Sequence, residues 1–167
     1  MNTEVTYKHG TVRVAHTRSS EPEPTADLVI SEEGETGYKS LVQLYLNGKQ
    51  STVAFLWSHF SDDASFCLHY SEENEVLFLG GGSVSAVVDT STLRLIDINY
   101  PMLFWRWELI KDHILELGET ECRLYTTKGK LVGAAQVDPP YEYRATDHSI
   151  EFTSIVAGKT NIELMKG

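Results

Sequence analysis

The chain has 167 residues, a formal net charge of −10 and two cysteines. This length predicts one domain with a substantial core, and two cysteines are too few for a disulfide framework. No apolar run is long enough to span a bilayer and the N-terminus lacks a signal pattern, so we expect a cytoplasmic protein. Between Lys49 and Arg94 there is no Lys or Arg. Such a negative field disfavours nucleic acid and favours a basic protein partner.

The first 70 residues predict β-hairpins. Two alternating segments surround His9-Gly10, and two more surround Asn47-Gly48, a pair typical of type I′ turns because both central residues need a positive φ. The polar segment 58–64 predicts a loop or a short helical turn. The expected strands of this part are residues 4–9, 11–17, 28–31, 41–46, 51–57 and 66–70.

From residue 75 the chain repeats itself without a gap at an offset of 38 residues, the distance from Val76 to Ile114. Each copy contains an apolar strand that ends in Gly, an alternating strand, a turn and another apolar strand. A fixed period of about 20–50 residues is typical of stacked supersecondary units, here β-meanders. Cys122 falls on Val84 of the first copy, which predicts a core position for this thiol. The predicted units are residues 75–137 for two full copies and residues 148–166 for a partial third.

A tryptophan pair lies just before the second copy, in a segment that alternates over residues 103–110. This pattern favours a strand over a helix. Because alternate residues share a face, we expect Trp105 and Trp107 to pack together in the core, with Arg106 outward beside Glu108. An aromatic clamp for a ligand, or an interface, is the alternative that the pair leaves open.

These elements predict an all-β chain that forms a single domain, residues 1–167. A closed propeller typically needs at least four blades of about 40 residues, and the chain has room for fewer. Each meander has one apolar face that it cannot bury alone, so neighbouring units must stack. We therefore expect antiparallel meander repeats in a β-sandwich or a partial propeller-like stack.

The repeat is similar to a known one. Residues 75–96 and 113–132 resemble blades of the quinoprotein-type propeller repeat, in which one strand reaches a Gly, a second ends in Asp and a turn leads into a third. The matching positions are turn and core positions. The resemblance therefore implies a propeller-like fold without a cofactor site, and no cofactor is expected.

Short acidic β-proteins with degenerate repeats also resemble the immunity proteins of bacterial polymorphic-toxin and contact-dependent inhibition systems. The likeness lies in size, charge, fold type and the lack of a catalytic motif. It implies a non-catalytic inhibitor that binds a cognate basic toxin domain, often a nuclease.

A cluster of acidic and aromatic residues before the repeat is the expected partner-binding surface. Its carboxylates would steer a basic partner and pair with Lys and Arg side chains, while its aromatic residues would serve as anchors. The residues predicted to bind the partner are Trp57, His59, Phe60, Asp62, Asp63, Tyr70, Glu72, Glu73 and Glu75.

The alternative is a small β-fold hydrolase, or a ligand- or metal-binding protein, that uses His59, Asp62 and His69. Imidazole and carboxylate groups bind Zn²⁺, but no second ligand pair in the sequence supports such a site. The glycines from Gly80 to Gly82 lack the Lys and Ser or Thr of a phosphate-binding loop, and a bulged hairpin turn explains them. We therefore assign no catalytic, cofactor or metal residue, and expect no membrane partner.

Overall fold

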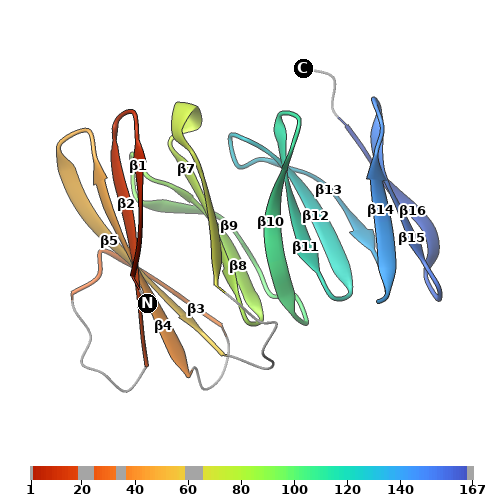
Figure 1. Ribbon diagram of the computed structural model, residues 1–167, viewed down its shortest axis with the longest axis horizontal. Helices are drawn as coiled ribbons and strands as arrows, with labels where there is room; N and C mark the ends of the chain where they lie inside the picture. Colours follow the sequence, from red (N-terminus) through yellow and green to blue (C-terminus); the bar gives the residue numbers. More distant parts are fainter. Residues whose placement is uncertain (1, 19–24, 33–36, 59–65, 165–167) are drawn as a thin grey trace.

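The computed structural model describes residues 2–18, 25–32, 37–58 and 66–164 (Figure 1). Within these ranges the chain consists of β-strands and one 3-10 turn, η1 (Glu72–Asn74), so the prediction of an all-β fold is confirmed. No helix in this part of the chain has the length and apolar character that a membrane crossing requires. The strands are β1 (Asn2–Tyr7), β2 (Gly10–Arg18), β3 (Leu28–Ser31), β4 (Tyr38–Leu46), β5 (Lys49–Trp57), β6 (Cys67–Ser71), β7 (Val76–Gly81), β8 (Val84–Asp89), β9 (Arg94–Asn99), β10 (Phe104–Ile110), β11 (His113–Gly118), β12 (Glu121–Thr126), β13 (Leu131–Gln136), β14 (Tyr141–Ala145), β15 (Ser149–Ser154) and β16 (Gly158–Glu163).

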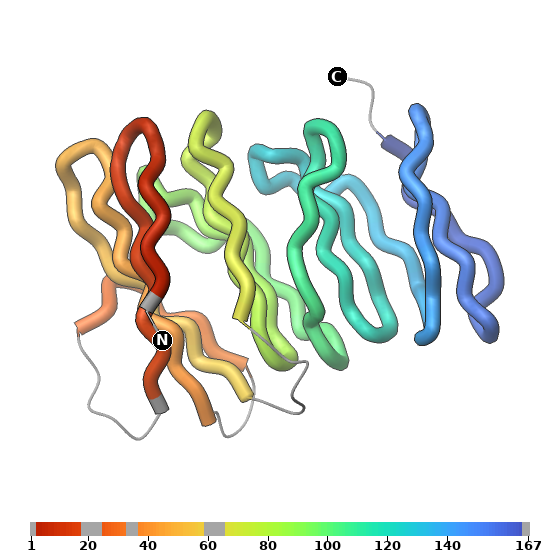
Figure 2. The backbone as a smooth tube through the Cα atoms, in the orientation of Figure 1, coloured from red at the N-terminus to blue at the C-terminus, as the bar shows by residue number. Residues whose placement is uncertain are grey.

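The strands form four sheets, which we number in chain order. The first sheet has the order β1-β2-β4-β5-β3, the second β6-β7-β8-β9, the third β10-β11-β12-β13 and the fourth β14-β15-β16. Paired strands are antiparallel apart from β3 and β5, which pair in parallel. The four sheets lie side by side in a row (Figures 1 and 2). The architecture is therefore an open, propeller-like stack.

The hairpin predicted at Asn47-Gly48 is present. The φ angles of these residues are 51° and 74°, as a type I′ turn requires. β4 and β5 then pair over their whole length without a register shift. This fixed register places Val42 and Val53 opposite each other, and both are fully buried against the second sheet.

The 38-residue repeat corresponds to the second and third sheets. β7 and β11 are equivalent strands, and so are β8 and β12, on which Val84 and Cys122 are both buried. Every residue of β7 and β11 is buried, because each strand lies inside a sheet that is covered on both faces. This explains why neither strand alternates between apolar and polar residues: β7 is a continuous apolar run, and β11 is apolar apart from the buried His113 and Glu116.

Three hydrophobic cores fill the spaces between neighbouring sheets. The first, around Phe55, joins the first and second sheets. Phe78 lies in the next core, between the second and third sheets, and Phe152 lies in the last, between the third and fourth. Burying one large apolar side chain contributes about 1.5–3 kcal/mol, so these interfaces are the main source of stability.

The outer faces of the two end sheets are polar. On the first sheet Arg13 pairs with Glu4 and lies over the ring of Tyr45. Arg144 and Glu151 form an ion pair of 2.9 Å on the fourth sheet. Polar end faces of this kind are what a stack of repeats needs at its boundaries with water.

Trp105 and Trp107 do not share a face, contrary to the prediction. A β-bulge at Trp105 interrupts the pairing of β10 with β11, so the alternation breaks there. Trp107 packs in the core between the second and third sheets, whereas Trp105 stacks on Tyr141 with ring centroids 5.2 Å apart. Arg106 and Glu108 form the expected outward pair, at 3.3 Å.

A buried polar network links the second and third sheets around Glu116. Ser85 Oγ donates to Glu116 Oε1 at 2.7 Å, and Asn99 Nδ2 donates to the same oxygen at 3.1 Å. The hydroxyl of Tyr125 donates to Asp97 Oδ2 at 2.9 Å. Burial raises the pKa of Glu116 to about 7, although its hydrogen bonds act in the opposite direction.

Candidate functional site: an acidic groove between the first two sheets

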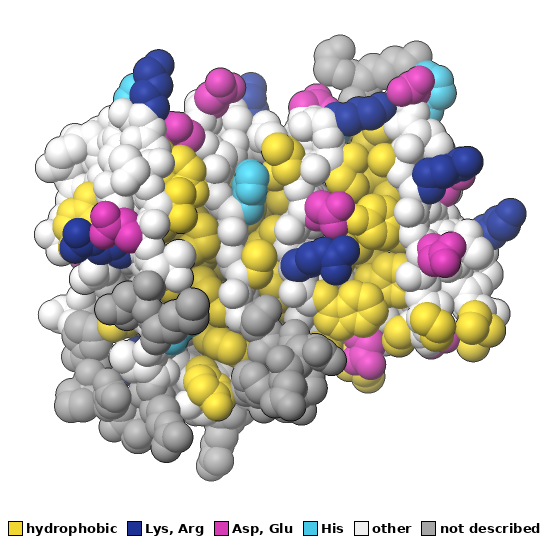
Figure 3. Space-filling view, in the orientation of Figure 1, with side chains coloured by type: hydrophobic (Ala, Val, Ile, Leu, Met, Phe, Trp, Pro, Cys, Tyr) yellow, Lys and Arg dark blue, Asp and Glu magenta, His cyan; other side chains and the backbone are white. Residues whose placement is uncertain are grey.

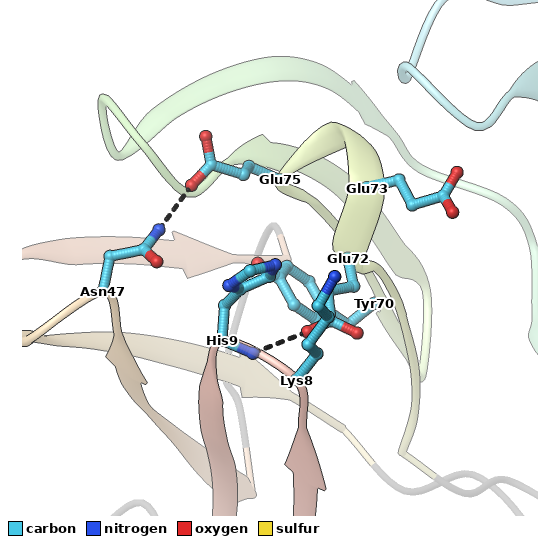
Figure 4. Close-up of a pocket in the computed structure, with 7 residues that line it drawn as sticks. All are labelled: Lys8, His9, Asn47, Tyr70, Glu72, Glu73 and Glu75. Carbon is cyan, nitrogen blue, oxygen red and sulfur yellow. Dashed lines mark hydrogen bonds between the residues drawn. The ribbon is translucent and has the colours of Figure 1, made fainter.

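Three turns meet at one end of the first two sheets and enclose a groove of about 330 Å³ (Figure 4). They are the β1–β2 turn, the β4–β5 turn and η1. We call this depression the acidic groove. Its lining residues are Lys8, His9, Asn47, Tyr70, Glu72, Glu73 and Glu75.

Hydrogen bonds between the turns fix the geometry of the acidic groove. The backbone N–H of His9 donates to Glu72 Oε1 at 2.8 Å. Asn47 Nδ2 donates to Glu75 Oε1 at 3.0 Å, and the N–H of Asn47 donates to the carbonyl of His9 at 3.0 Å. The two hairpin tips and η1 therefore hold one another in place.

Glu75 adopts a backbone conformation that is unusual for its residue type. Its φ of 54° lies in the left-handed region, where Gly or Asn is favoured. The Glu75 carbonyl accepts hydrogen bonds from both the N–H and Oγ1 of Thr90, each at 2.9 Å. A carboxylate is thus held at a position where strain costs on the order of 1 kcal/mol.

Glu73 is the most accessible carboxylate of the groove. It projects from the opposite side of η1 from Glu75 (Figure 4). Within the part of the chain that the structure describes, Glu73 makes no hydrogen bond or ion pair. The groove as a whole holds three carboxylates against the single ammonium group of Lys8. It therefore presents a negative potential to an incoming ligand.

A second depression, of about 480 Å³, continues from the acidic groove. The two share Asn47 and Glu75, and Asp27 adds a further carboxylate. Asp27 Oδ2 accepts a hydrogen bond from the N–H of Thr52 at 2.8 Å. The depression also contains Lys49, and it extends the groove along the seam between the first and second sheets, from η1 to the β8–β9 turn.

The structure brings together only part of the predicted binding residues. The carboxylates of Glu72, Glu73 and Glu75 line one groove. The residues His59, Phe60, Asp62 and Asp63 lie outside the described residues.

Trp57 and Tyr70, the expected hydrophobic anchors for the partner, are both buried. Trp57 is 5% exposed, donates from Nε1 to Ser40 Oγ at 2.9 Å and stacks on Tyr38. Tyr70 is 6% exposed and meets Tyr7 edge to face, with ring centroids 5.0 Å apart. Both rings face the core because their strands alternate toward it, and Tyr70 also lines the acidic groove.

The part of the chain that the structure describes does not form the hydrolase or metal site of the alternative hypothesis. His69 lies half-buried on β6, 6.1 Å from the ring of Phe78, and burial lowers its pKa. Its proposed companions, His59 and Asp62, are outside the described ranges. Within those ranges no three His, Cys, Asp or Glu side chains converge as metal ligands would.

Sequence reasoning missed three residues of the groove: Lys8, His9 and Asn47. The turns that carry them were predicted, and the turn chemistry at Asn47 was recognised. Their position beside η1 follows from the packing of the first sheet on the second. That packing joins segments more than 25 residues apart and leaves no local signal.

No protein-family model matches the chain, and no curated protein matches it. Solved structures of β-propeller proteins do resemble it. BamB from Moraxella catarrhalis is 7% identical over 77% of this chain and 40% of its own, with a TM-score of 0.39. The β-propeller domain of the Trilobed protease from Pyrococcus furiosus is 10% identical over 94% of this chain and 51% of its own, with a TM-score of 0.48. The chain thus spans about half or less of these proteins, and the likeness concerns the fold alone.

Proposed function

We propose that this chain is a non-catalytic binding protein whose acidic groove receives Lys or Arg side chains of a basic protein partner. The observation that supports it is that Glu72, Glu73 and Glu75 all line one groove whose turns are hydrogen-bonded to one another. Glu72 and Glu75 are fixed by hydrogen bonds before binding, so they lose little conformational entropy on pairing with cations, and Glu73 adds an accessible charge.

In its most specific form, the proposal is an immunity protein that neutralises a basic toxin domain such as a nuclease. The support is the net charge of −10, the all-β fold and the small size of the chain. The groove carboxylates would occupy cationic groups with which such a toxin binds its own anionic substrate. Complementary charge of this kind accelerates association and excludes wrong partners.

Charge reversal at one accessible position tests the proposal. The protein is immobilised and used to capture proteins from its native host, with Glu73→Lys and Glu142→Lys in parallel. Glu73 bonds nothing in the described chain, so its replacement leaves the hydrogen bonds between the turns intact. Glu142 is an exposed carboxylate on β14, at the other end of the stack, and controls for the change in net charge.

We expect a basic protein to be captured by the wild type and by Glu142→Lys. Its affinity for Glu73→Lys should be roughly tenfold lower, since an attractive contact becomes repulsive. Coexpression of the captured protein in a bacterial host then tests the toxin form, because only the wild type should restore growth fully. Equal capture by all three proteins would show that the acidic groove does not bind the partner.

A further inference from the structure

The acidic groove adjoins β1, which pairs on one side only among the strands that the structure describes. β1 is the edge strand, and it pairs with β2 over residues 2–7 without a register shift. The tight turn makes Tyr7 and Gly10 a hydrogen-bonded pair. By the alternation of an antiparallel ladder, the N–H and C=O groups of Glu4 and Thr6 point away from β2. A regular, unpaired edge of this kind is a template for another strand.

Among the described strands, the other sheet edges carry features that discourage pairing. Bulges at Ile96, Trp105 and Val132 interrupt β9, β10 and β13. β3 has only four residues, and β6 packs against β10. The edges β14 and β16 carry the exposed charged residues Glu142 and Lys159, which form no ion pair with the described residues. β1 shows none of these protections, since its charged residue Glu4 is paired with Arg13.

A largely apolar groove of about 310 Å³ lies beside this edge, and we call it the edge groove. Alternate residues of β1 and β2 face it, with Val12 and Val14 buried beneath and Val5 43% exposed at the rim. Figure 3 shows hydrophobic side chains along this seam between the first and second sheets. The lining residues are Thr3, Val5, Tyr7, Val12, Val14, His16, Phe66, Cys67 and Leu68.

We propose that β1 and the edge groove bind an extended segment of the partner protein by strand addition. The segment's backbone pairs with the outward N–H and C=O groups of Glu4 and Thr6. Its alternate side chains are apolar and enter the edge groove, covering Val5. At the end nearest the β1–β2 turn the segment carries basic residues, which reach Glu72 and Glu73 in the acidic groove. This inference rests on the proposed function, because it supposes the same basic protein partner.

Charge and size favour such a segment over a second copy of this chain. Two copies would each bring a net charge of −10 to the contact. A six-residue edge also offers far less than the roughly 20–30 residues per side of a stable interface between folded proteins. Strand addition to a short peptide needs no larger surface, since main-chain hydrogen bonds supply much of the affinity.

The test uses a fluorescent eight-residue peptide in which two N-terminal lysines precede alternating valine and threonine, so that antiparallel pairing with β1 places the lysines at the β1–β2 turn. Binding is followed by fluorescence anisotropy with the wild type, Thr6→Pro and Thr6→Ala. Proline removes the outward N–H of residue 6 and is tolerated on an edge strand, whereas alanine keeps that donor. Val5→Lys places a charge in the edge groove and leaves the backbone N–H groups of β1 in place. The same peptide with alternate backbone amides N-methylated is the matched probe.

We expect the peptide to bind the wild type and Thr6→Ala, and to bind Thr6→Pro and Val5→Lys roughly tenfold more weakly. The N-methylated peptide should bind none of the four. Three results would overturn the inference: no binding to the wild type, equal binding to Thr6→Pro, or a wild-type dimer that Thr6→Pro dissociates. The last result would make a second copy the occupant. None of these results would contradict the proposed function. That function is tested separately by the capture experiment with Glu73→Lys, which does not involve β1.

Discussion

At the scale of single residues, the chain places two carboxylates in unfavourable positions, one with a left-handed backbone conformation and one buried between sheets. Glu75 occupies a left-handed backbone position that favours Gly, and Glu116 is 1% exposed between two sheets. Each is held by specific donors, Asn47 for the first, and Ser85 and Asn99 for the second. Such departures from local preference concentrate at sites under functional or structural constraint. Neither could be predicted from sequence, because both depend on contacts between sheets.

The raised pKa of Glu116 predicts a specific dependence of stability on pH. Burial raises this pKa from 4.5 to about 7. Between these values the folded protein holds a proton that the unfolded chain has released, so the free energy of unfolding falls as pH rises and levels off above about 7. In Glu116→Gln, whose amide oxygen can still accept from Ser85 and Asn99, this contribution is absent.

Urea unfolding of both proteins from pH 5 to pH 8 measures the effect. The stability of Glu116→Gln relative to the wild type should increase by roughly 2–3 kcal/mol over this range. Comparison of the two proteins cancels the titration of all other groups, including His16 and His69, whose lowered pKa values act in the opposite direction. Parallel stability curves would show that Glu116 does not titrate in this window.

At the scale of elements, sequence patterns predicted the strands well and their faces less well. The Asn47-Gly48 turn and the 38-residue repeat were legible because turn chemistry and apolar runs are local signals. The parallel pairing of β3 with β5 was not predicted, since it depends on how the chain returns to the first sheet. The bulge at Trp105 shifted the tryptophans to opposite faces, and nothing in strict alternation indicates where a bulge falls.

The contact between β7 and β10 gives a prediction about how the second and third sheets pack. A Cβ atom on Gly80 would lie 2.3 Å from the ring of Phe104, which is fully buried. Gly80→Ala should therefore lower the free energy of unfolding by about 1–3 kcal/mol, as overpacking does. Phe104→Leu in the Gly80→Ala background should recover part of the loss, because the smaller side chain leaves room for the methyl group.

Chemical denaturation of the two single variants and the double variant gives the coupling energy. We expect a negative coupling energy. The double variant should lose less free energy of unfolding than the two single variants lose together. Strict additivity would mean that the two positions do not meet, and that the second and third sheets pack differently from the arrangement described here.

At the scale of the whole molecule, the four sheets form a stack whose polar end faces and three internal cores explain its stability. Of the two predicted architectures, a sandwich and a partial propeller-like stack, the structure has the second, because both inner sheets are covered on two faces. The candidate site lies on the seam between the first and second sheets. Sequence analysis found its three carboxylates as a charged segment, but the groove itself exists only once two hairpin tips pack beside η1.

The central claim is that a basic partner is drawn to the acidic groove by charge. The most direct test is the association rate constant of the captured partner, measured by stopped-flow mixing at low and at physiological salt. For the wild type this rate should fall steeply as salt rises, and for Glu73→Lys it should start lower and fall less, because screening acts on the attraction that the groove supplies. An association rate that is independent of salt and unchanged in Glu73→Lys would contradict the account.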